Sequence, residues 1–272
     1  MSAARTLLML GDVTGEAGLG ALEKLLDGLK RDYNAHFIVV NGENAAAGFG
    51  MTQTEAQRIF AAGADVITSG NHIWEKREFL DYLKTEPRIL RPANYPDVYW
   101  SGTAPPAKIP GKGVVTLEKD GLVWTVMNLQ GREYMTPIDC PFRTFDSIFA
   151  SLPPFPAVVI VDFHAESGSE KEAFGLYLDG RAAVVAGTHT HIQTADERIL
   201  PGGTAYITDL GMTGATDGII GMDRALCLER ARTQVLFKLE CATAQPAAQG
   251  IAVTFDKTTG RPVTIERFAR NL

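Results

Sequence analysis

The sequence predicts an α/β protein in which two β-sheets pack together with helices outside them. The first half alternates short apolar runs with amphipathic stretches, the pattern of successive strand–helix units. The middle carries two adjacent β-rich runs joined by Asp120-Gly121, a dipeptide suited to a tight hairpin turn. The alternation then resumes.

Three strand–helix units are expected in the first half. The leucines of the first helix recur on one face at helical spacing. Thr52 and Glu55 form a capping box that begins the second helix, and the two prolines within 91–96 end the third unit, because proline cannot continue a helix. The expected strands are 5–10, 36–40 and 65–68, and the expected helices are 16–31, 52–62 and 74–83.

The second half is richer in strands. The hairpin of 113–118 and 122–128 indicates an antiparallel insertion or part of a second sheet. Two helices are then expected over 142–152 and 169–178, and further strands over 156–161, 182–186, 204–208, 234–239, 251–255 and 263–268. No internal repeat, low-complexity tract or linker separates these elements, so residues 1–272 are expected to form a single domain.

Composition excludes several classes of protein. The chain has 272 residues, of which 45% are hydrophobic and 21% charged, which rules out intrinsic disorder, collagen-like repeats and a disulfide-stapled miniprotein. Lysine and arginine total 26 against 32 acidic residues, and a net charge of −6 supplies no basic field for a long nucleic acid. A small phosphorylated ligand remains compatible with this charge.

The cysteines and the apolar runs bear on location. Three scattered cysteines are too few for a disulfide framework or a Cys-ligated zinc site, which favours a reducing compartment. The apolar run at the N-terminus ends early at Gly11-Asp12, and no stretch reaches the roughly 20 apolar residues of a membrane span. We therefore expect a cytoplasmic protein without a membrane partner.

Metal-capable side chains follow five of the expected strands at the point where each ends. In α/β sheets ligand sites assemble at that edge, because the loops converge there above rigid strands. Four of the five histidines lie in these loops, whereas His36 begins a strand. The residues are Asp12, Glu43-Asn44, Asn71-His72, His164, and His189-Thr190-His191.

The donor set indicates a particular kind of cation. Imidazole, carboxylate and amide groups without a thiolate suit Fe, Mn or Zn better than Ca²⁺, whose ligands are oxygens only. Each piece also has a structural explanation: Asp12 alone is more often a turn or cap residue, and His189 with His191 could be a satisfied polar pair in the core. Their joint placement at strand ends favours a pair of transition-metal ions.

The order of these residues resembles that of the calcineurin-like metallophosphoesterases. Six segments are similar to the YmdB-like branch of that superfamily, over nearly the full length of the chain. They are Gly11-Asp12-Val13, Asn41-Gly42-Glu43-Asn44-Ala45, Gly70-Asn71-His72-Ile73-Trp74, Arg91-Pro92-Ala93-Asn94-Tyr95, Gly187-Thr188-His189-Thr190-His191 and Thr208-Asp209-Leu210-Gly211-Met212-Thr213-Gly214. The resemblance implies a four-layer α/β/β/α double β-sandwich with a dinuclear metal site at the carboxyl ends of the strands.

The resemblance also implies which residues hold each ion. Two positions depart from the wider superfamily: Thr14 stands where a histidine is usual, and Glu43 replaces the usual bridging aspartate. Asn44 takes the place of the missing ligand. Carried over residue by residue, metal one would be held by Asp12, Glu43, Asn44 and His191, and metal two by Glu43, Asn71, His164 and His189. The ions expected are divalent or trivalent, Fe or Mn first and Zn as a further candidate.

The implied chemistry is phosphoester hydrolysis. Two cations about 4 Å apart share a water, lower its pKa and clamp a phosphoryl group for in-line attack by the bridging hydroxide. His72, beside the expected ligand Asn71, resembles the general acid that protonates the leaving oxygen. Asp162 and Glu166 flank His164 and either orient imidazoles or are solvated loop carboxylates. Phe49 and Met51 have two possible roles: contact with the base or sugar of a substrate, or packing in the core or on the surface.

The resemblance points to a phosphodiester substrate such as a 2′,3′- or 3′,5′-cyclic nucleotide, and to a possible homo-oligomer. An amidohydrolase barrel also uses a His-x-His pair and an aspartate, but there the pair follows the first strand and the aspartate comes late, the reverse of the order here. A metal-bound regulatory protein, whose output is binding a nucleotide or a partner, stays open as the alternative. Turnover separates these functions.

Overall fold

The first sheet unites the strands of the first half with strands from the end of the chain. The computed structural model describes residues 4–96, 98–100, 107–152 and 157–272. Strand order is β2-β13-β14-β1-β3-β4, with β15 also paired to β14, and β1, β3 and β4 run parallel. The members are β1 (Ala4–Leu10), β2 (Asp12–Val13), β3 (Phe37–Asn41), β4 (Val66–Thr68), β13 (Met212–Ala215), β14 (Pro246–Asp256) and β15 (Pro262–Asn271).

The second sheet contains the expected hairpin. Strand order is β11-β12-β10-β9-β8-β7, and β8, β9, β10 and β12 are parallel. Asp120 and Gly121 both have positive φ, 53° and 79°, as a type I′ turn requires. The hairpin is therefore an integral edge of this sheet. The members are β7 (Val114–Lys119), β8 (Leu122–Gln130), β9 (Ala157–His164), β10 (Val184–Thr188), β11 (Arg198–Ile199) and β12 (Ala205–Ile207).

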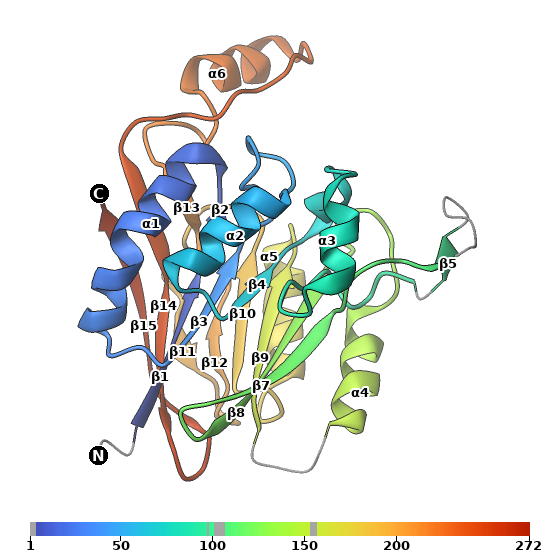
Figure 1. Ribbon diagram of the computed structural model, residues 1–272, viewed down its shortest axis with the longest axis vertical. Helices are drawn as coiled ribbons and strands as arrows, with labels where there is room; N and C mark the ends of the chain where they lie inside the picture. Colours follow the sequence, from blue (N-terminus) through green and yellow to red (C-terminus); the bar gives the residue numbers. More distant parts are fainter. Residues whose placement is uncertain (1–3, 97, 101–106, 153–156) are drawn as a thin grey trace.

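Helices cover the outer face of each sheet, which completes the predicted four-layer α/β/β/α double β-sandwich (Figure 1). The predicted capping box is present: the Thr52 side chain accepts from the helix backbone and Glu55 accepts from the Thr52 N–H. On the first sheet lie α1 (Gly15–Asp32), α2 (Gln53–Ala62) and α3 (Phe79–Thr85), and on the second lie α4 (Pro141–Ser151) and α5 (Gly168–Tyr177).

Strand β1 shows how the residue pattern makes these layers. Leu8 and Leu10 face the helices, whereas Leu7 and Met9 face the second sheet, because successive side chains in a strand point to opposite faces. Between the sheets Phe37 stacks on Trp124 with ring centroids 4.8 Å apart. Apolar packing on both faces holds the strand ends, and the loops that follow them, in fixed positions.

Two local expectations are wrong. The helix expected over 74–83 is broken into a 3₁₀ turn, η1 (Asn71–Trp74), and α3, which begins only at Phe79. The strand expected over 234–239 does not form with any described residue. β-prone residues make a strand only where another strand supplies its hydrogen bonds, and this segment follows a helix that stands off the sheets, α6 (Arg224–Thr233) (Figure 1).

Helix α6 was not expected, since it has no buried residue and hence no apolar face to read. It begins at Asp223, whose carboxylate accepts from the Leu226 N–H. The short pair β5 (Tyr99–Trp100) and β6 (Ala107–Lys108) was also not expected. Position 156, included in an expected strand, lies outside the described residues. None of the described helices combines the length and apolar character needed to cross a membrane.

Candidate metal centre

The seven predicted ligand residues come together at one edge of the double sandwich. The carboxyl ends of β3 and β9 meet there across the two sheets: Asn41 Nδ2 donates to Asp162 Oδ2 over 3.1 Å. The loops that follow β1, β3, β9 and β10, together with the turn after β4, therefore open onto one space. Five of the seven side chains are buried in it, and Asn71 and His189 are partly exposed.

His164 is the centre of the first group. Its Nε2 lies 3.1 Å from Glu43 Oε1, 3.1 Å from Asn71 Oδ1 and 3.0 Å from His189 Nδ1. Four donor atoms that point at one another across these distances surround a space suited to a single cation. This is the set that the resemblance assigns to metal two.

The second group lies on the other side of Glu43. Asn44 Nδ2 is 3.0 Å from His191 Nε2 and donates to Glu43 Oε1 over 3.4 Å. Asp12 Oδ2 accepts from the His189 N–H over 3.2 Å. A half-turn of the Asn44 amide exchanges its oxygen and nitrogen and would present Oδ1 to a cation. The group matches the set assigned to metal one, with Glu43 shared.

The side chains fit a metal centre better than a polar core. Asp12 Oδ1 and Asn44 Oδ1 are buried without any hydrogen-bond partner, and a buried acceptor without a donor is costly. In the described part of the chain no lysine or arginine pairs with the buried carboxylates of Asp12 and Glu43, and the cationic group beside them is the His164 imidazole. Bound cations would satisfy both orphaned oxygens and take over from the His164 proton in balancing the carboxylates.

Several ionisable side chains of the cluster have pKa values far from their ordinary ones. Burial raises the pKa of Asp12 to about 6. Burial also opposes ionisation of Glu43 and His164, but their mutual attraction outweighs it, so that the pKa of Glu43 falls to about 2 and that of His164 rises to about 9. Burial, with His164 nearby, lowers the pKa of His189 to about 3. His189 is thus neutral, the form that binds a metal.

A buried network beneath the cluster orients His164. Its Nδ1 lies 2.9 Å from Thr188 Oγ1, and that hydroxyl donates to Asp162 Oδ1 over 2.7 Å. Thr68 and Asn41, from the other sheet, donate to the second Asp162 oxygen. Asp162 therefore ties the two sheets together and leaves His164 Nε2 facing the cluster.

The loop of His189 and His191 has an unusual backbone. Both histidines have positive φ, 98° and 63°, which costs free energy in residues other than glycine. Asp209 holds the loop by accepting from both the N–H and the hydroxyl of Thr190. The Asp209 carboxylate is paired in turn with Lys171, whose Nζ is 2.6 Å away and which is 2% exposed.

Two further contacts fix the histidine rings. His189 Nε2 lies 3.2 Å from Glu166 Oε2, so its Nδ1 is the atom directed at the cluster. His191 Nδ1 lies 2.8 Å from the carbonyl oxygen of Ile220 and donates to it, which leaves Nε2 for a cation. Glu166 thus orients an imidazole, one of the two possibilities open from the sequence.

His72 lies at the rim of the cluster and outside its centre. Its N–H donates to Glu43 Oε2 over 3.3 Å, and its Nδ1 is 3.4 Å from Glu75 Oε1. Phe49 packs edge-on against the ring with centroids 5.2 Å apart. This position separates His72 from the ligand cluster, and Nε2 remains for contact with a substrate. Met51, in contrast, is fully buried in the core.

Sequence reasoning missed four residues at the site: Glu75, Lys171, Ile220 and the role of Asp209. Glu75 could have been predicted as a partner of His72, since it lies three residues further along the same turn. The others act through contacts between distant segments, for which the chain carries no local pattern.

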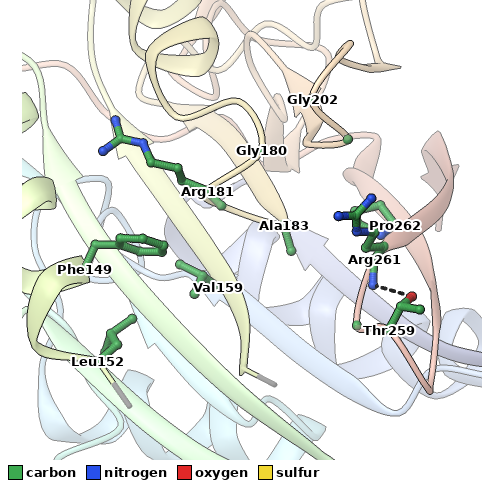
Figure 2. A pocket seen from close by; sticks show the side chains of 13 residues that line it. Phe149, Leu152, Val159, Gly180, Arg181, Ala183, Gly202, Thr259, Arg261 and Pro262 are labelled. Carbon is green, nitrogen blue, oxygen red and sulfur yellow. Dashed lines mark hydrogen bonds between the residues drawn. The ribbon is translucent and has the colours of Figure 1, made fainter. Parts of the chain in front are cut away.

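Two of the cavities that are larger than the one at the cluster lack metal-binding side chains. One of about 430 Å³ lies at the opposite, amino-terminal ends of β9 and β10, and Figure 2 shows its lining, which contains Arg181 and Arg261 but no carboxylate or imidazole. The other, of about 600 Å³, is lined by apolar side chains that include Trp74 and Leu80, together with Arg77. The cavity at the cluster, about 300 Å³, combines carboxylate and imidazole groups.

The chain is similar to known proteins in both sequence and structure. The chain is 43% identical to the 2′,3′-cyclic-nucleotide 2′-phosphodiesterase of Bacillus subtilis (strain 168), over 97% of each chain. A crystal structure of a hypothetical protein from Thermus thermophilus superposes with a TM-score of 0.87 at 37% identity, covering 98% of this chain and 99% of that one.

A second crystal structure, described as a novel phosphatase from Mycoplasma pneumoniae, superposes with a TM-score of 0.91 at 29% identity, covering 100% of this chain and 95% of that one. The family model described as YmdB-like protein matches residues 8–268. The match includes every strand end that contributes to the cluster. The chain therefore belongs to the YmdB-like protein family.

Proposed function

We propose that this chain is a dinuclear metal-dependent phosphodiesterase that hydrolyses cyclic nucleotides, with 2′,3′-cyclic nucleotides as the first candidates. The observation that carries the proposal is the convergence of seven donor side chains in which Asp12 Oδ1 and Asn44 Oδ1 are buried without partners. The name of the Bacillus subtilis relative supports the choice of substrate. We assign Asp12, Glu43, Asn44 and His191 to one ion and Glu43, Asn71, His164 and His189 to the other.

Bound Fe or Mn, or Zn, would supply an activated water and positive charge opposite the phosphoryl oxygens. The chain's own side chains orient the ligands of these ions. Asp162 through Thr188, and Glu166 directly, hold His164 and His189 in the orientation that a cation needs.

His72 is proposed to protonate the leaving oxygen. Glu75 lies against Nδ1 and steadies the ring, so that Nε2 is the atom offered to the substrate. The ring also lies at the rim of the cavity, where a leaving group departs toward solvent. A group in the centre of the ligand cluster would lack that access.

The experiment is turnover by protein of known metal content. Protein stripped with a chelator and reloaded with Mn²⁺ or Fe²⁺ is assayed on bis(p-nitrophenyl) phosphate and on 2′,3′-cyclic AMP, with elemental analysis of the same sample. We expect hydrolysis of both by loaded protein and loss of activity and metal together in Asp12→Ala. Loaded protein that hydrolyses neither would instead support a regulatory protein that binds its ligand. Sedimentation of the same sample tests the expected homo-oligomer.

A further inference from the structure

The cavity of the candidate site has two unlike sides. One is the cluster of carboxylates, amides and imidazoles. The other is formed by Gly48, Phe49, Ile220 and Met222, which we call the apolar wall. A phosphodiester alone needs only the first side, so the second side calls for an explanation.

Phe49 lies in a tight loop that leads directly on from Glu43 and Asn44. The loop is closed by the Ala46 N–H donating to the Gly50 carbonyl over 2.9 Å. Gly48 has φ +87°, and a Cβ there would lie 2.8 Å from Met222 Cε. The loop therefore packs closely on Met222 and holds Phe49 at a fixed distance from the cluster.

Ile220 is held in a conformation that isoleucine rarely adopts. Its φ is +50°, and a β-branched residue with positive φ is a genuine outlier. Its carbonyl oxygen accepts from His191 Nδ1, and the residue, which is 43% exposed, lines the cavity. The same residue thus orients an expected metal ligand and presents an apolar side chain to whatever occupies the cavity.

The wall offers contact area without hydrogen bonding. The side chains of Phe49, Ile220 and Met222 carry no N–H or O–H group. The hydroxyl of Thr190, which lines the same cavity, is already used in donating to Asp209. Base-to-aromatic packing tolerates any base because every base has a π-face, whereas reading a base requires donors and acceptors aimed at its edge.

We propose that the apolar wall is the surface on which the nucleobase of the substrate packs, and that it requires a base without distinguishing among the four. This rests on the proposed function, since it assumes that a nucleotide is the substrate. The ribose would then span from the wall to the ligand cluster, with His72, which Phe49 contacts, beside the leaving oxygen.

The test compares cyclic phosphodiesters with and without a base. Metal-loaded protein is assayed for kcat/KM on the 2′,3′-cyclic phosphates of adenosine, guanosine, cytidine and uridine and on glycerol 1,2-cyclic phosphate. We expect the four nucleotides to agree within roughly threefold and to exceed the glycerol compound by roughly 10- to 100-fold. In Phe49→Ala and Ile220→Gly this preference should fall to a few-fold, because kcat/KM for the nucleotides drops more than for glycerol 1,2-cyclic phosphate.

Leu80→Ala is the matched control, since Leu80 lines the other apolar cavity; it should retain the wild-type preference. The inference is overturned if the wild-type protein hydrolyses the glycerol compound as well as the nucleotides, if Phe49→Ala keeps the preference, or if Leu80→Ala loses it. Should the wild-type protein hydrolyse none of them, the proposed function fails. Calorimetric titration with 2′,3′-cyclic AMP and the glycerol compound then tests the wall directly, and equal affinities overturn it.

Discussion

Replacing Gly70 by alanine would place a methyl group inside the proposed metal centre. Gly70 directly precedes Asn71, and an ideal Cβ at this position lies 2.2 Å from His164 Nε2 and 2.3 Å from Glu43 Oε2. Its φ of −154° is outside the left-handed region, so the effect of the substitution is steric and does not arise from backbone strain.

The size of the effect follows from these distances. Ordinary van der Waals contact begins at 3.4 Å, so His164 and Glu43 would each have to retreat by about 1 Å, whereas protein ligands keep their distances to a metal within about 0.2 Å. His164 cannot retreat freely, because Thr188 and Asp162 hold it from below. Loss of a supporting contact alone lowers metal affinity by about 10- to 100-fold. We expect Gly70→Ala to lower it by at least that much.

The assay is elemental analysis after dialysis against a fixed concentration of Mn²⁺, with circular dichroism to confirm folding. Gly20→Ala and Gly28→Ala are matched controls, because a Cβ at either position meets nothing within 4 Å; each should keep full metal content and gain about 0.5–1 kcal/mol of stability from the better helix former. A folded Gly70→Ala protein with wild-type metal content would refute the proposed placement of the ions.

Three other predictions follow from the same contacts. His72→Ala should keep near-normal metal content while turnover falls roughly 10²-fold or more; loss of the cations in elemental analysis would make His72 a ligand instead. Lys171→Met leaves the buried Asp209 carboxylate without its cation and should cost about 3–5 kcal/mol in urea unfolding, with Tm lower by roughly 5–15 °C; a loss below about 1 kcal/mol would contradict the pairing. Because burial raises the pKa of Asp12 to about 6, a cation must displace its proton below that pH. Mn²⁺ affinity measured by calorimetry should therefore weaken as pH falls through about 6. In metal-free protein the raised pKa of Asp12 favours the folded state; this contribution to stability is fully present below the unfolded pKa of 3.8 and is lost as pH rises through about 6. A pH-independent affinity between about pH 5 and 7 would argue against Asp12 as a ligand.

Local sequence by itself predicted two sheets with helices outside them and the place of the candidate site. The apolar run at 7–10 predicts a buried strand, which the structure confirms by burying its two faces in different cores, and the Thr52 capping box marks a helix start that the structure reproduces. The polar residues after successive strands needed only one further fact, that parallel strands end at a common edge. These features are readable because each depends on neighbours within a few positions along the chain.

Tertiary structure decided everything that depends on contacts between distant segments. The β-prone run at 234–239 forms no strand with the described residues, because no partner strand lies beside it. The pairing of Lys171 with Asp209, the positive φ of Ile220 and the opposed pKa shifts of Glu43 and His164 arise only once the loops of both sheets converge. Burial and electrostatic coupling are properties of that assembled environment, so residue types and spacing alone do not determine them.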